Sequence, residues 1–139
     1  MDTTIHVAGN ATRDPELRFT QSGVAVCTLN LACNNRIKGA DGEWKDDEPV
    51  FIAVTAWRQL GENVAASVKK GDRVMVTGPL KLRKWEKEDG TKGSSLEMTA
   101  DDVACSFKWA TGEMQRTNRS SSGGVSTSHQ EAPPPEEPF

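Results

Sequence analysis

The segment from Pro49 to Trp57 alternates with a period of two, which is typical of a β-strand. One side of this segment is aliphatic and is expected to face a core: Val50, Ile52, Val54 and Ala56. The other side carries Phe51 and Trp57, with small residues between them. A solvated face without a ligand would favour polar side chains. The two rings therefore indicate a surface on which a planar ligand can stack.

A third ring, Trp85, ends another alternating segment, which starts at Asp72. The aliphatic side of this segment is expected to be buried: Val74, Val76, Leu80 and Leu82. The opposite side combines the ring with cations, and further cations lie beside it or in a polar segment nearer the N-terminus. Rings and cations interleaved on a sheet suit single-stranded nucleic acid, because its bases stack at roughly 1–3 kcal/mol each while its phosphates follow the positive charge. The candidate DNA-binding residues are Phe51, Trp57, Trp85, Arg36, Lys38, Arg73, Lys81, Arg83 and Lys84.

Structural roles are the alternative interpretation of these residues. Trp57 would then cap the core where the strand meets a helix, Phe51 would fill a subunit interface, and the lysines and arginines would be solvated. The overall charge does not decide, since 17 Lys and Arg face 20 Asp and Glu, a net charge of −3. A basic stripe on one face is nevertheless sufficient to hold phosphates. A duplex hides its base faces, so the rings favour single strands of any sequence.

Catalysis finds little support in the sequence. The two histidines, His6 and His129, lie far apart, and no metal cluster, cofactor site or phosphate-cradling Gly-Lys-Ser/Thr loop occurs. The three cysteines, Cys27, Cys33 and Cys105, cannot all pair within one chain, which suits a reducing cytoplasm. No secretory signal or membrane-spanning run is visible. We therefore expect a non-enzymatic, cytoplasmic protein without metal or cofactor. If it binds DNA, we expect it to be associated with the nucleoid.

The last seven residues form a candidate docking peptide. They follow a stretch rich in Ser, Gly and Pro that cannot build a core, so residues 110–139 are predicted to be a disordered linker and tip. The aromatic end of this tail would fill an apolar pocket on a partner protein while the carboxylates meet basic residues at its rim. The docking residues are Glu136, Glu137, Pro138 and Phe139. The alternative is a solubilising tail whose final Phe has no role.

The order of patterns predicts the fold of residues 1–109. Strands are expected over Thr4–Gly9, Val24–Cys33, Pro49–Trp57, Asp72–Trp85 and Ser95–Val103. A helix over Gln59–Lys70, stopped by Gly71, separates the third strand from the fourth. A bulge or bend is expected at Gly78–Pro79, and Asn34–Pro49 is expected to be an extended hairpin tip that carries Trp44. These elements predict an all-β protein, a five-stranded Greek-key barrel of the OB-fold type with one short helix.

Several motifs resemble those of the bacterial single-stranded DNA-binding proteins, in an actinobacterial form. The resemblance covers about residues 4–108 and the final Glu-Glu-Pro-Phe. The motifs that carry it are Val7-Ala8-Gly9-Asn10, Asp14 to Phe19, Ser22-Gly23, Trp57 to Lys70, Gly71 to Val74 and Gly78 to Trp85. The resemblance implies an OB-fold, a homotetramer, and sequence-independent binding of single-stranded DNA in replication, repair and recombination. It also implies stacking roles for Phe51, Trp57 and Trp85, and recruitment of replication and repair enzymes by the acidic Pro-Phe tip.

The rival interpretations are an OB-fold adaptor that binds only proteins, and RNA as the main ligand.

Two departures from the family pattern stand out. Ile37 occupies a place where many members have an aromatic residue, so one stacking platform is either absent or replaced by nearby Trp44. The segment from Ala110 to Pro135 lacks the long Gly/Gln-rich tract of many relatives. Such a short linker fits an accessory paralogue or a phage-encoded copy.

Overall fold

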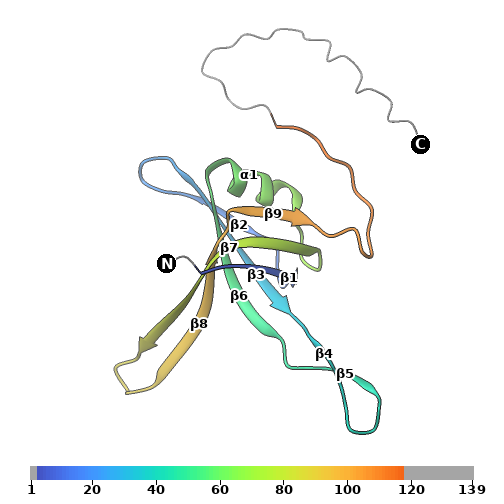
Figure 1. Cartoon of the computed structure of the whole chain (residues 1–139). Helices are drawn as coiled ribbons and strands as arrows, with labels where there is room; N and C mark the ends of the chain where they lie inside the picture. The colour runs from blue at the N-terminus through green and yellow to red at the C-terminus, as the bar shows by residue number, and fades with distance from the viewer. Residues whose placement is uncertain (1–2, 118–139) are drawn as a thin grey trace, which may run out of the picture.

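The computed structural model describes residues 3–117 (Figure 1). Nine strands and one helix occur in this part of the chain. Their order is β1 (Thr4–Ala11), β2 (Glu16–Phe19), β3 (Ala25–Cys33), β4 (Arg36–Lys38), β5 (Trp44–Asp46), β6 (Val50–Trp57), α1 (Arg58–Ser67), β7 (Arg73–Glu86), β8 (Lys92–Thr99) and β9 (Asp102–Cys105).

Five of the strands close into a barrel in the order β1-β3-β6-β8-β7, and β7 pairs back with β1. The pairing of β6 with β8 is parallel, and the other pairings around the barrel are antiparallel. Helix α1 lies between the third and fourth barrel strands, β6 and β7. This is the predicted five-stranded Greek-key barrel of the OB-fold, with β2 added beside β3 and β9 added beside β7.

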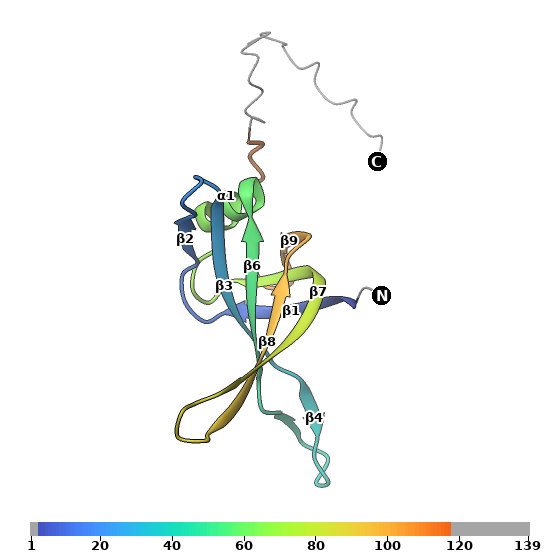
Figure 2. The same cartoon turned by 90° about the vertical axis from the view of Figure 1, so that its left-hand side faces the viewer.

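Two hairpins project from the same end of the barrel (Figures 1 and 2). One is the outer half of β7 with β8, and the other is the short ribbon of β4 and β5, which forms the predicted hairpin tip. Strand β7 belongs to both the barrel and the first of these hairpins. It pairs with β1 as far as Pro79 and with β8 from Leu80. A Cβ on Gly78 would collide with the carbonyl oxygen of Thr99, so this close approach requires glycine. The predicted bend at Gly78–Pro79 is thus the point at which β7 changes partner.

The core is built from the inward sides of the alternating strands, as predicted for β3 and β6. Val54 and Leu29 are fully buried, and Ile52 is nearly so. Two residues predicted to be buried are instead exposed, Val50 by 41% and Leu82 by 50%. Both lie where a strand leaves the barrel for a projecting hairpin, so no second layer covers them within the described residues.

The helix ends at Ser67, three residues before the predicted end. Val68 is already extended, with φ −88° and ψ 138°, and is buried in the core. The next two amides bond to carboxylates instead of helix carbonyls: Lys69 N donates to Asp72 Oδ2 at 2.9 Å, and Lys70 N donates to Asp14 Oδ1 at 2.8 Å. These side-chain acceptors compete with helix continuation.

The predicted last strand, Ser95–Val103, is divided into β8 and β9. Between them the chain crosses from β6 to β7, since Ala100 N donates to the carbonyl of Thr55 at 2.8 Å and Asp101 N donates to that of Thr77 at 2.7 Å. The change of partner ends one strand and begins the next.

Candidate nucleic-acid interface

The outward side of β6 carries two exposed aromatic rings. Phe51 is 62% exposed and Trp57 is 44% exposed, while Ile52 and Val54 point inward. Phe51 and Trp57 are six residue steps apart along the strand, a distance of about 20 Å at the usual rise per residue. The rings therefore mark the two ends of a platform along β6, as the alternation in the sequence predicts.

The third ring lies on the same outer surface, two strands away. In the pairing of β7 with β8, Trp85 is opposite Gly93, Arg83 is opposite Ser95, and Lys81 is opposite Glu97. In the parallel pairing of β8 with β6, Glu97 is opposite Ala53. Because paired residues point to the same side of a sheet, all three rings share one surface with Lys81 and Arg83. We call this outer surface of β6, β8 and β7 the β6–β8–β7 face; Figure 2 looks onto its strands.

One carboxylate lies within the β6–β8–β7 face. Glu97 Oε1 is 3.5 Å from Arg83 Nη1, and Glu97 is also the direct cross-strand neighbour of Lys81. The Glu97 side chain is 37% exposed, so its negative charge interacts electrostatically with any charged ligand that approaches the face. A phosphate has to compete with Glu97 for Arg83. The sequence reasoning did not identify this residue.

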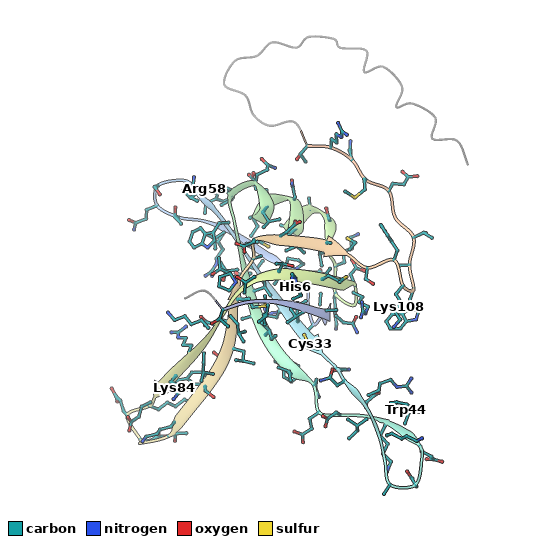
Figure 3. The ribbon with its side chains drawn as sticks, in the orientation of Figure 1. His6, Cys33, Trp44, Arg58, Lys84 and Lys108 are labelled. Carbon is teal, nitrogen blue, oxygen red and sulfur yellow. The ribbon has the colours of Figure 1, made fainter. Side chains whose placement is uncertain are left out.

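The β4–β5 ribbon presents the hairpin candidates on one of its two sides. Arg36 is paired with Asp46 and Lys38 with Trp44, so these four residues point the same way. Arg36 Nε lies 3.7 Å from Asp46 Oδ1, an exposed ion pair. Ile37 points to the opposite side of the ribbon, so Trp44 does not occupy the side on which Ile37 lies. Trp44 and Lys84 lie on separate hairpins (Figure 3).

Besides Arg36 and Lys38 on the β4–β5 ribbon, two further predicted site residues lie outside the β6–β8–β7 face. Lys84 alternates with Arg83 and Trp85, so it lies on the other side of the β7–β8 hairpin, opposite Ser94. Arg73 shares the strand side of Trp85, as predicted, but belongs to the half of β7 that pairs with β1, where it is opposite Asn10. Its guanidinium donates to Ser106 Oγ at 3.0 Å and lies 5.3 Å from the centre of the Trp109 ring.

Two arginines missed by the sequence reasoning border the same sheet. Arg18 of β2 is paired with Val26, which is paired with Trp57, so the three residues form one outward row. Arg13 follows β1 and lines a pocket of about 360 Å³ together with Phe51. The outward position of Arg18 follows only once β2 is known to pair with β3, and no strand over Glu16–Phe19 was expected from the sequence.

The described residues contain no group of three or more His, Cys, Asp or Glu residues arranged to hold a metal ion. Burial raises the pKa of the Cys27 and Cys33 thiols, which disfavours the reactive thiolate. Within residues 3–117, no helix is long and apolar enough to cross a bilayer. The predicted docking residues Glu136, Glu137, Pro138 and Phe139 lie outside the described residues.

The sequence is similar to proteins of known family. Residues 2–106 match the model of the Single-strand binding protein family. A "Single-stranded DNA-binding protein" of Mycobacterium bovis is 43% identical over 133 residues, covering 95% of this chain and 80% of the relative. A protein of the same description from Mycolicibacterium smegmatis is 45% identical over 120 residues, covering 86% of this chain and 73% of the relative.

The fold has a solved counterpart as well. The crystal structure of a small single-stranded DNA-binding protein from Streptomyces coelicolor superposes with a TM-score of 0.67 at 29% identity. The match covers 76% of this chain and 95% of the other. Since the family match spans most of the chain and is supported by the relatives and by the fold, the protein belongs to the single-strand binding protein family.

Proposed function

We propose that this protein binds single-stranded DNA without sequence preference through the β6–β8–β7 face. The observation that carries the proposal is the presence of three large exposed rings, Phe51, Trp57 and Trp85, on one surface with Lys81 and Arg83. Bases stack on the rings, and phosphates follow the cations at the edges. Family membership and the names of the relatives support the same ligand.

Arg36, Lys38 and Trp44 extend the binding path along the β4–β5 ribbon. Lys84 approaches the phosphate backbone from the other side of the β7–β8 hairpin, and Arg73 contributes to the surface potential from the β1 side. The protein coats strands exposed in replication, repair and recombination, and it acts as a homotetramer in the cytoplasm. These roles rest on the family resemblance.

Tryptophan fluorescence tests the proposal, because Trp57 and Trp85 are reporters within the proposed site. Trp109 is 74% exposed and packs against Lys108 and Arg73 beyond β9, so a Trp109→Phe variant removes a distant signal. A dT oligonucleotide is expected to quench the remaining fluorescence, with an affinity that falls as salt rises. A matching duplex is expected to quench weakly.

The alanine variants of the three rings give the quantitative test. Phe51→Ala, Trp57→Ala and Trp85→Ala should each weaken dT binding by about 1–3 kcal/mol. If the Trp109→Phe protein shows neither quenching nor an anisotropy change with labelled dT, the rings are structural and the adaptor interpretation replaces strand binding. Preference for matching RNA over dT would make RNA the main ligand.

We further propose that residues 1–109 form the DNA-binding domain and that residues 110–139 are a linker whose tip docks replication and repair proteins. Deletion of Glu136 to Phe139 is expected to preserve DNA binding and to abolish recovery of such proteins from a bacterial lysate. Because the tail is anionic, its removal should also tighten DNA binding slightly at low salt. Loss of folding on deletion would refute this domain division.

A further inference from the structure

The loop after β1 is fastened to the centre of β3. Thr12 N donates to the backbone carbonyl of Asn30 at 2.9 Å, and Ala11 N donates to the carbonyl of Asp72 at 2.9 Å. These bonds fix the backbone of the two residues that directly precede Arg13. The next residue, Asp14, accepts from Lys70 N at 2.8 Å, so Arg13 is held between two anchored neighbours.

The side chain of Arg13 is oriented by the side chain of Asn30. In the amide orientation that satisfies both groups, the Asn30 oxygen accepts from Arg13 Nη2 at 2.9 Å and from Arg13 Nε at 3.0 Å. This contact uses one edge of the guanidinium, so donors on Nη1 and the second Nη2 proton remain for another partner. Within residues 3–117, no carboxylate forms an ion pair with Arg13, in contrast to Arg83 and Arg36.

A pocket opens beside this oriented guanidinium. Its volume of about 360 Å³ is at the lower end of the ~300–1,000 Å³ typical of small-ligand sites. Its lining brings together the ring of Phe51, the polar groups of Arg13 and Asn30, and Ser95 of β8. The lining contains no acidic residue. A ring that offers a stacking face and a fixed cation next to it are the two halves of a nucleotide site.

We propose that Arg13, positioned by Asn30, binds the phosphate of the nucleotide whose base stacks on Phe51. The inference rests on the proposed binding of single-stranded DNA and adds a subsite to it. Phosphate is the favoured partner because the planar guanidinium presents paired donors to phosphate oxygens and keeps its charge at any physiological pH. Arg83, on the other side of Phe51, is engaged by Glu97, so Arg13 is the cation next to this ring that no carboxylate neutralises in the described part of the chain.

Salt-dependent binding of a labelled dT oligonucleotide to the full chain tests the subsite. Arg13→Ala should weaken binding roughly tenfold at low salt. This loss of affinity is near the lower limit of the range expected for a hydrogen bond to a charged group. The slope of log K against log salt should become shallower by about 0.7, the value for one phosphate of a single strand. Lys108→Ala is the matched control, since it removes one positive charge that lies against Trp109 and should change neither quantity. Thermal unfolding of each variant checks that the fold is intact.

The role of Asn30 is tested by a double-mutant cycle. Asn30→Ala should weaken dT binding when Arg13 is present and have no further effect in the Arg13→Ala background, because the two residues act through one contact. Arg13→Lys should recover the salt slope and only part of the affinity, since a lysine cannot keep the Asn30 fork. Additive effects in the cycle would overturn the positioning role of Asn30.

Two results would overturn the phosphate subsite itself. One is an unchanged affinity and salt slope in Arg13→Ala. The other is a loss for dG but not for dT, which would assign Arg13 to the edge of a base. Failure of the wild-type protein to bind dT would instead refute the proposed function, so the two failures are distinguishable within one series.

Discussion

The indole of Trp85 lies across the backbone of its cross-strand partner, Gly93. A Cβ built on Gly93 would be 2.5 Å from Cε2 and 2.8 Å from Nε1 of the indole, so any side chain at residue 93 would occupy the place of the ring. Trp85 is nevertheless 43% exposed. Because Gly93 has no side chain, the indole can pack against the backbone of the hairpin while one of its faces stays open to a ligand.

Gly93→Ala is expected to displace the Trp85 ring and to weaken binding of a dT oligonucleotide. The loss should approach the roughly 1–3 kcal/mol of one stacking platform. Fluorescence anisotropy measures the affinity, and circular dichroism checks the fold. Ser94→Ala, one residue further on and on the other side of the hairpin, is the matched control and should leave the affinity unchanged. Equal effects of the two substitutions would contradict the role of Gly93.

Glu97→Gln is expected to tighten binding of dT. The substitution releases Arg83 from its 3.5 Å ion pair and removes a negative charge from the β6–β8–β7 face. Exposed charge pairs contribute about 0.2–1 kcal/mol, so the gain in affinity should be at most roughly fivefold at low salt and should shrink as salt screens the charge. Glu62→Gln removes the same charge from α1, outside the β6–β8–β7 face and both projecting hairpins, and serves as control. Weaker binding by Glu97→Gln would show that Glu97 orients Arg83 productively.

Alternation in the sequence determines which side of a strand a residue occupies, and this was sufficient for Phe51, Trp57 and Trp85. The alternation does not show which neighbouring strand each half of a long strand pairs with in a closed barrel. Arg73 and Trp85 have the same parity on β7, yet the first faces the β1 side and the second the β8 side. The alternation also does not show whether another element covers an inward-facing residue. For this reason the sequence did not predict the exposure of Leu82 in the projecting hairpin. The pairing of Arg13 with Asn30 joins two segments far apart in the chain and has no local signature.

The three thiols are expected to differ in reactivity toward a disulfide reagent near pH 8. Cys105 is exposed, whereas burial raises the pKa of Cys27 and Cys33, so these two carry less thiolate at a given pH. One fast thiol per chain is expected in the native protein, with the other two released on unfolding. Cys105→Ser should abolish the fast phase, and a fast phase that survives this substitution would refute the assignment.

Arg58→Gly is expected to stabilise the fold. Arg58 begins α1 directly after Trp57 with φ +60°, a left-handed conformation that costs about 1–2 kcal/mol for a residue with a side chain. Glycine adopts it freely, and after the extra entropy of glycine in the unfolded chain is subtracted, a gain of about 0.5–1 kcal/mol remains. Arg58→Ala removes the same charge but keeps the strain, so it should not share the gain. Thermal unfolding compares the two variants, and equal melting temperatures would mean that the backbone at residue 58 is not strained.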